Sequence, residues 1–283
     1  MGHLVKIPGF ALEGVEFRPG AADRRINGIS LSDESIVVNE TEYLQKVAGV
    51  GKFYASDGRY VEYLAEEGAD PEWVHLYLNG QVLVALLHQR RIINFHASSF
   101  SHEGKGVIVL GDTGAGKTSL TVAFAMSDSR YLSDDLTPVV FRKAVPHIWS
   151  FNRKIKLRPD SLGQLSISNE RLTEAEAGTG KMYLHPDRKP EEFHQLDVIL
   201  KIETGEVEDP AFSELSPSEK FTILRSGICS WEILAGMPST EKAYLQQLVR
   251  IIERVHFVRV VRPAGIRIVE MKDAVRNYLE SGY

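Results

Sequence analysis

The sequence predicts an α/β fold, with a phosphate-binding core and a small mixed α/β segment before it. Residues 111–118 read Gly-Asp-Thr-Gly-Ala-Gly-Lys-Thr, which matches the pattern G-x-x-x-x-G-K-[ST] at every fixed position. The apolar run at 107–110 predicts a buried strand before this loop, and 119–126 predicts a helix after it. Strands and helices then alternate along the chain, which is typical of an α/β nucleotide-binding core.

Residues 1–90 are expected to form the N-terminal segment, and residues 91–283 the phosphate-binding domain. The N-terminal segment has three strand candidates, followed by a helix at 81–89; the strands are expected at 35–38, 52–55 and 73–78, the last ending at the turn signal Asn79-Gly80.

The second domain is expected to alternate strands with helices, with one loop. Strands are expected at 92–96, 107–110, 138–141, 147–151, 196–202 and 256–261, and helices at 119–126, 216–226 and 240–255. Residues 268–279 are expected to form a strand and then a helix. The polar, Gly- and Glu-rich stretch at 169–180 is expected to be a mobile loop.

Composition excludes several classes of protein. The formal net charge of −5 over 283 residues argues against a general nucleic-acid binder, which is usually basic. The single cysteine, Cys229, cannot form an intrachain disulfide and suits a reducing compartment. The apolar run at 82–87 is too short to span a bilayer, and the N-terminus has no signal-peptide pattern. We therefore expect a cytoplasmic protein without nucleic-acid or membrane partners; self-association stays open.

The glycine loop carries the clearest chemistry. Its glycines let backbone N–H groups converge on an anion, and the helix N-terminus adds partial positive charge. Lys117 would reach the β- and γ-phosphates of ATP or another NTP, and the Thr118 hydroxyl would help to bind Mg²⁺. The alternative is a glycine-rich turn with an incidental lysine. The expected nucleotide-binding residues are Gly111, Asp112, Thr113, Gly114, Ala115, Gly116, Lys117, Thr118 and Ser119.

A pair of adjacent carboxylates, Asp134-Asp135, follows the segment Arg130-Tyr131-Leu132-Ser133. Alternate side chains of a strand point to opposite faces, so the two carboxylates can divide their roles. One can serve Mg²⁺, and the other can accept a proton from an attacking hydroxyl. The alternative is a solvated turn or a helix cap.

Two further candidates, His96 and the basic cluster at 153–160, can each have either an ordinary structural role or a functional one. His96 ends an apolar strand directly before the loop strand, where a histidine is often a buried structural residue. The cluster at 153–160, Arg-Lys-Ile-Lys-Leu-Arg-Pro-Asp, can face a phosphate or form a solvated face.

The combined spacing resembles the catalytic domain of the HPr kinase/phosphorylase family. The segment that carries the resemblance contains His96-Ala97-Ser98, then Gly-Asp-x-Gly-x-Gly-Lys-[ST] from Gly111, then Leu132-Ser133-Asp134-Asp135. It spans about residues 92–162. The broader group phosphorylates serine on proteins or peptides and includes precursor-peptide kinases of lasso-peptide biosynthesis.

This resemblance implies a P-loop core of HPr-kinase type in residues 91–283, with a role for each matched residue. Lys117 would polarise the transferred phosphate, and Thr118 would ligate Mg²⁺. Asp135 would accept the proton of the substrate hydroxyl, with Asp134 beside it at the metal. His96 matches a histidine that the family places at the active site. Phosphoryl transfer asks mainly for positioning, charge neutralisation and a nearby base.

The chain departs from the family after the paired aspartates. The Glu-Ile-Arg-Gly-Leu-Gly-like signature is absent, and the corresponding stretch reads Lys156-Leu157-Arg158-Pro159-Asp160-Ser161-Leu162. Asp160 is the candidate for the missing metal-binding carboxylate. The difference argues against HPr as the acceptor and against phosphorylase activity.

The expected function is an ATP- and Mg²⁺-dependent kinase acting on a Ser/Thr hydroxyl of a peptide or protein. The alternatives are a kinase for a small hydroxyl compound and a nucleotide-binding regulatory module without phosphotransfer. Substrate choice usually depends on loops and added segments. The acceptor is therefore expected to approach Asp135 between 169–181 and 1–90, with Lys156, Arg158 and Lys181 as charge partners.

Overall fold

The computed structural model describes residues 10, 12–19, 24–30, 36–127, 129–150, 155–157, 159–165, 167, 172–174, 182–184 and 193–282. The chain divides into two units, one containing Met1–Asn94 and Ile228–Gln247, the other Phe95–Gly227 and Leu248–Tyr283. This division differs from the expected one at residue 90, because 228–247 belongs to the first unit. Tyr244 explains the assignment, since its buried hydroxyl donates to the Ile92 carbonyl over 2.8 Å.

The first unit contains a five-stranded sheet in the order β1-β5-β4-β3-β2. β1 pairs with β5 in parallel, and the other neighbours are antiparallel. The strands are β1 (Glu16–Pro19), β2 (Ile36–Val38), β3 (Glu42–Val47), β4 (Gly51–Ser56) and β5 (Tyr60–Ala65).

A continuous helical segment follows this sheet. It consists of α1 (Pro71–Tyr77), the π-helical turn η1 (Leu78–Val82) and α2 (Leu83–Gln89). The strand predicted at 73–78 is therefore wrong. The Asp70 side chain accepts the Glu72 N–H over 2.9 Å and caps the helix. Val74 and Leu78 are buried four residues apart, which is a helical spacing.

The second unit is built on a larger sheet that includes the order β10-β11-β15-β8-β7-β9, with β17 paired to both β15 and β16. β8, β15 and β17 run parallel, with β15 in the middle. Their carboxyl ends therefore meet at one edge, where α/β folds usually bind ligands. The strands are β7 (Ser98–His102), β8 (Lys105–Gly111), β9 (Arg130–Ser133), β10 (Thr137–Arg142), β11 (Val145–Trp149), β15 (Phe193–Gly205), β16 (Ala211–Glu214) and β17 (His256–Pro263).

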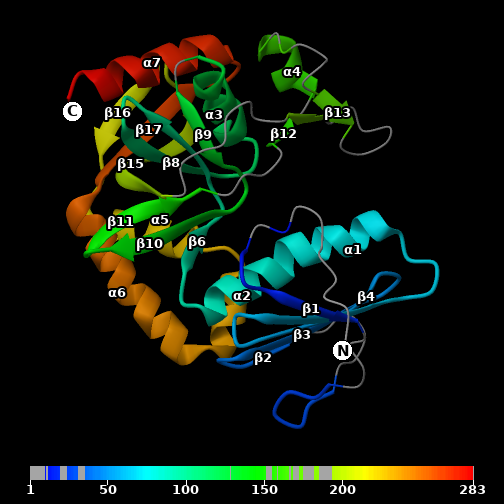
Figure 1. Cartoon of the computed structure of the whole chain (residues 1–283). Coiled ribbons are helices and arrows are strands. Elements are labelled where there is room, and N and C mark those ends of the chain that lie inside the picture. The colour runs from blue at the N-terminus through cyan, green and yellow to red at the C-terminus, as the bar shows by residue number, and fades with distance from the viewer. Residues whose placement is uncertain are drawn as a thin grey trace. The chain divides into compact units, whose positions relative to one another are not determined.

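Two helices, α3 (Lys117–Ala125) and α7 (Ile268–Glu280), pack together against this sheet (Figure 1). Phe124 of α3 stacks on Phe100 of β7 with ring centroids 4.3 Å apart. Met271, Val275 and Leu279 of α7 join the same buried cluster at a spacing of four residues. The core beneath the glycine loop is therefore closed by these two helices.

Further elements complete the unit. A small antiparallel sheet joins β12 (Ile155–Leu157), β14 (Met182–Leu184) and β13 (Leu172–Glu174). The other helices are α4 (Pro159–Leu165) and α5 (Pro217–Ser226). The boundaries between the units fall within β6 (Ile93–Phe95), after Gly227 and within α6 (Pro238–Arg254). A 3₁₀ helix at Trp231–Gly236 belongs to the first unit.

The flanking strand and helix of the glycine loop are confirmed, and the described fold is mixed α/β. Two other predictions are corrected. Residues 268–279 are helical throughout, because Glu270 pairs with the Arg267 side chain and accepts its backbone N–H, which starts the helix at Ile268. Within the expected loop at 169–180, Leu172–Glu174 forms a strand; the rest lies outside the described residues. In the part of the chain that the structure describes, none of the helices combines the length and the apolar character needed to cross a bilayer.

Candidate active site

The glycine loop connects β8 to α3 with the conformation that an anion-binding loop requires. Gly114 and Gly116 have positive φ values of 88° and 101°, which side-chain-bearing residues rarely adopt. A Cβ atom on Gly111 would lie 2.7 Å from the Ile202 carbonyl oxygen of the neighbouring strand. Glycine at these positions therefore lets the loop turn tightly into the N-terminus of α3, where backbone N–H groups attract anions.

Lys117 is the first residue of α3, and its side chain lies over the loop. Its Nζ donates to the Gly111 carbonyl over 2.8 Å and to the Asp112 carbonyl over 3.3 Å. Burial lowers the pKa of this amine, while the charges of Asp135 and Asp134 act in the opposite direction. The amine is thus held between the loop and the paired carboxylates.

Asp134 follows β9 and is buried beside the start of α3. The Thr118 hydroxyl donates to its Oδ1 over 2.9 Å, and the Ser98 hydroxyl donates to the same oxygen. Burial first, and then the charge of Asp135, raises the pKa of this carboxyl well above its usual range; the two hydroxyl groups oppose the shift. The Thr118 hydroxyl and the Asp134 carboxylate are oxygen groups of the kind that could hold a hard cation.

Asp135 adopts a left-handed backbone conformation with φ of 62°, and its side chain is exposed. This conformation turns the chain so that Asp134 and Asp135 reach different surroundings. The His96 Nδ1 lies 3.2 Å from the Asp135 carbonyl oxygen. A carbonyl only accepts, so Nδ1 carries the proton in this hydrogen bond. The His96 backbone N–H donates to the Gly227 carbonyl over 2.8 Å.

A cavity of about 510 Å³ brings the predicted residues together. His96, Asp135, Lys156 and residues 113–119 line it. Apolar side chains line another part of the same cavity, namely Leu157, Ile266, Ile268 and Met271. Phosphate-binding and apolar groups thus share one space, within the size range of small-ligand sites.

The remaining residues predicted for the site lie in different parts of the second unit or outside the described residues. The Asp112 carboxylate lies 3.7 Å from Lys201 Nζ. The Ser119 hydroxyl lies 2.7 Å from that of Ser161, which links α3 to α4. Asp160 is in the first turn of α4, but its side chain lies outside the described residues. The remaining predicted basic residues lie wholly outside the described residues, and these are Arg153, Lys154, Arg158 and Lys181.

Sequence reasoning missed two basic residues beside the loop. Arg262 Nε donates to the Ala115 carbonyl over 2.8 Å, and its Nη2 lies 3.3 Å from the Gly114 carbonyl. Lys201 pairs with Asp112 as described above. Both residues lie toward the carboxyl ends of strands parallel to β8. Other charged residues lie in the same strands, such as Glu203 and Arg259, so residue type alone does not single out Lys201 or Arg262.

Comparisons with known proteins give only distant structural likenesses. The chain is similar to the solved structure of the Hpr(Ser) kinase/phosphatase from Coxiella burnetii, with 13% identity and a TM-score of 0.36. The alignment covers 66% of this chain and 97% of that chain. No family model matches the chain, and no curated protein matches it. A likeness this distant says nothing about activity, so the proposal below depends on the site residues.

Proposed function

We propose that this chain is an ATP- and Mg²⁺-dependent kinase that transfers the γ-phosphate to a serine or threonine hydroxyl of a peptide or protein. One observation carries the proposal: Asp135 and Lys117 line the same cavity as the glycine loop. A module that only binds nucleotide has no need of a carboxylate beside the phosphates. A kinase needs one as the proton acceptor.

The donor set fits ATP with Mg²⁺. Hard cations such as Mg²⁺ prefer oxygen ligands, and Thr118 and Asp134 offer a hydroxyl and a carboxylate already in contact. Asp134 is buried at a high electrostatic cost, which a bound cation would offset. Bound Mg²⁺ would neutralise charge on the β- and γ-phosphates.

The chain's own residues then account for the transfer. The Lys117 amine would contact the β- and γ-phosphate oxygens, leaving its present carbonyl partners. The Asp135 carboxylate would accept the proton of the acceptor hydroxyl while the hydroxyl oxygen forms a bond to the γ-phosphorus. The bond from that phosphorus to the β,γ-bridging oxygen breaks, and ADP leaves with the bonding electrons. His96, hydrogen-bonded to the Asp135 carbonyl, would position the base.

The exposure of Asp135 favours a peptide or protein acceptor. The cavity volume of about 510 Å³ is comparable with what one nucleotide requires, so the acceptor must approach from the open side. A hydroxyl on an extended chain can do so without being enclosed. A precursor peptide of the lasso-peptide type is one candidate acceptor, because the group that the sequence resembles includes kinases of such peptides.

The test measures ADP formation and phosphopeptide formation together. Wild-type protein and Asp135→Asn are incubated with ATP and Mg²⁺, with a degenerate serine and threonine peptide library or with a library lacking hydroxyl residues. We expect library phosphorylation that depends on hydroxyl residues and on Asp135. Turnover with glycerol or free serine in place of peptides would favour the small-molecule kinase. Tight ATP binding with no turnover dependent on Asp135 would favour the regulatory module.

A further inference from the structure

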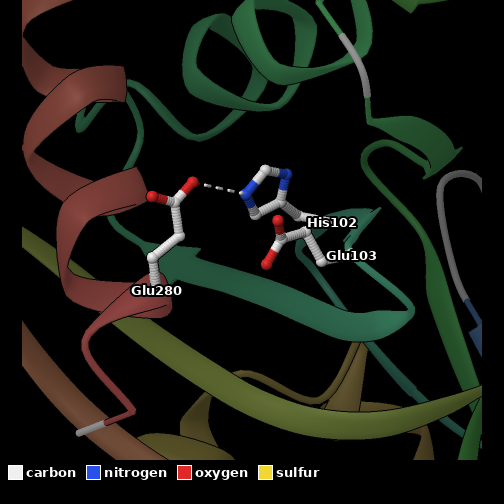
Figure 2. A group of neighbouring side chains, drawn as sticks. All are labelled: His102, Glu103 and Glu280. Carbon is white, nitrogen blue, oxygen red and sulfur yellow. Dashed lines mark ion pairs between the residues drawn. The ribbon is translucent and has the colours of Figure 1, made fainter.

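A second group of metal-binding side chains lies at the opposite end of β8 from the glycine loop. Its members are His102 at the end of β7, Glu103 in the turn that follows, and Glu280 at the end of α7 (Figure 2). Their ligand atoms all lie within 4.8 Å of one another. β8 separates this group from the loop by roughly 20 Å, at about 3.3 Å per residue. The group is therefore not part of the nucleotide site.

His102 is the buried member of the group, with 2% of its surface exposed. Its Nδ1 lies 2.8 Å from the Ser129 hydroxyl, which fixes the ring. Its Nε2 is buried without a hydrogen-bond partner and faces the Glu280 carboxylate, 3.5 Å away (Figure 2). An imidazole fixed through one nitrogen, with the other directed at carboxylates, is the arrangement of histidine ligands in metal sites.

The 3.5 Å separation is compatible with an ion pair and also with two ligands of one metal ion. It exceeds the 2.7–3.2 Å expected of an N–H···O hydrogen bond. Two ligands of one tetrahedral Zn²⁺ ion, each bonded at about 2.0–2.1 Å, lie about 3.3–3.4 Å from one another. The His102–Glu280 spacing therefore also fits two ligands of one ion, and the ligand atom of Glu103 lies within 4.8 Å of both.

The group itself carries charge that favours a cation. It contains two carboxylates, and Glu280 is the last residue of α7, where the helix dipole is negative. Lys105, Arg130 and Arg276 are positive residues on the neighbouring elements. Lys105 Nζ donates to the Leu279 carbonyl over 2.9 Å, and Arg276 Nη1 lies 3.9 Å from the Asp273 carboxylate.

We propose that His102, Glu103 and Glu280 bind one divalent transition-metal ion, with Zn²⁺ as the best match for one imidazole and two carboxylates. The ion would join the β7–β8 turn to the end of α7. It would stabilise this end of the unit and would take no part in phosphoryl transfer. This site is separate from the proposed function and stands without it.

The competing explanation is a simple ion pair between protonated His102 and Glu280. The two explanations differ in Glu103, because an ion pair needs only Glu280, whereas the metal site needs both glutamates. Both glutamates are exposed, so replacing them is expected to leave the fold intact.

The experiment titrates ZnCl₂ into the full untagged chain without nucleotide, by isothermal calorimetry, with Co²⁺ absorption as a second readout. We expect Glu103→Gln and Glu280→Gln each to lower the Zn²⁺ affinity of one site at least about tenfold. The double variant is expected to bind one equivalent of Zn²⁺ fewer than the wild type. Glu253→Gln, an exposed glutamate of α6, serves as the matched control. Zn²⁺ should raise the melting temperature of the wild type but not of the double variant. Equal stoichiometry and affinity in wild type and double variant would overturn the proposal, as would Glu103→Gln binding like wild type.

Discussion

The Thr118 hydroxyl donates a hydrogen bond to Asp134 Oδ1 over 2.9 Å, and so joins the first turn of α3 to the end of β9. The contact links two residues that are far apart in sequence, one from the glycine loop motif and one from the paired aspartates. Ser98 donates to the same carboxylate oxygen from β7. Three elements therefore fix the position of Asp134, whereas Asp135 next to it is exposed to solvent. This difference in burial is the basis for the separate roles proposed for the two carboxylates.

Lys117→Ala is expected to abolish phosphoryl transfer and to weaken ATP binding. The variant loses a charge-assisted contact to the phosphates, at a cost on the order of 2–4 kcal/mol in the transition state. The measurement is kcat/KM for ATP turnover, with ATP affinity by calorimetry. A folded Lys117→Ala protein with normal turnover would contradict the site assignment.

Asp135→Asn is expected to retain ATP affinity and to lose transfer by about 10²–10⁴-fold. The amide has a similar shape but cannot accept the proton of the acceptor hydroxyl. Asp134→Asn should instead raise the Mg²⁺ concentration that gives half-maximal rate. Single-turnover rates across a Mg²⁺ series separate the two effects. If Asp134→Asn removes the chemical step while Asp135→Asn keeps it, the two roles are reversed.

Asp134→Asn is also expected to stabilise the protein at alkaline pH in the absence of Mg²⁺. The folded-state pKa of Asp134 is raised to about 7, above that of an unfolded aspartate, mainly by burial. Stability contributed by the protonated carboxyl is present in acid and is lost as pH rises from about 4 to about 7. Asparagine carries no charge, so the variant should gain up to about 4 kcal/mol over wild type at pH 8 and little at pH 4.

Urea unfolding in EDTA at both pH values measures this difference in the free energy of unfolding. Asp209→Asn, an exposed aspartate, is the control and should show no such pH dependence. A variant that is less stable than wild type at pH 8 would show that the charged carboxylate is satisfied by Thr118 and Ser98 alone.

The sequence predicted the strand and helix that flank the glycine loop better than it predicted the N-terminal fold. The glycine loop, its flanking elements and the candidates His96, Lys117 and Asp135 could be recognised because each carries chemistry in its residue type and spacing. Their common cavity was not visible, because it depends on how β7, β8 and β9 pair. Arg262 was missed for the same reason, since nothing near it in sequence indicates that it contacts the loop.

The error at 73–78 has a different origin. The alternation from Trp73 to Leu78 resembled a strand, but the segment forms a helix whose outer face is apolar, with Trp73 and Leu76 53% and 55% exposed. The alternation of residues at 73–78 therefore predicted a strand where the chain forms a helix. The start signal Asp70-Pro71-Glu72 was the better guide, because it combines an N-cap, a proline at the first position and an acid in the first turn.

Arg262→Gln is expected to weaken ATP binding about tenfold, or ~1.4 kcal/mol, through the shape of the glycine loop. The guanidinium contacts the carbonyls of Ala115 and Gly114, and all three residues line the cavity. Without the guanidinium, the loop has to become ordered when the nucleotide binds, and this cost reduces the affinity for ATP. Calorimetry with ATP and Mg²⁺ measures the change, and Arg254→Gln at the exposed end of α6 is the control.

Arg262→Lys separates this positioning role from direct phosphate binding. A lysine keeps the charge but lacks the planar fork that reaches two carbonyls at once. If Arg262 acts by fixing the loop, the lysine variant should bind ATP no better than the glutamine variant, with kcat changed less than KM. If Arg262 instead contacts the phosphates, lysine should restore most of the affinity, and the salt dependence of binding should follow the charge at this position.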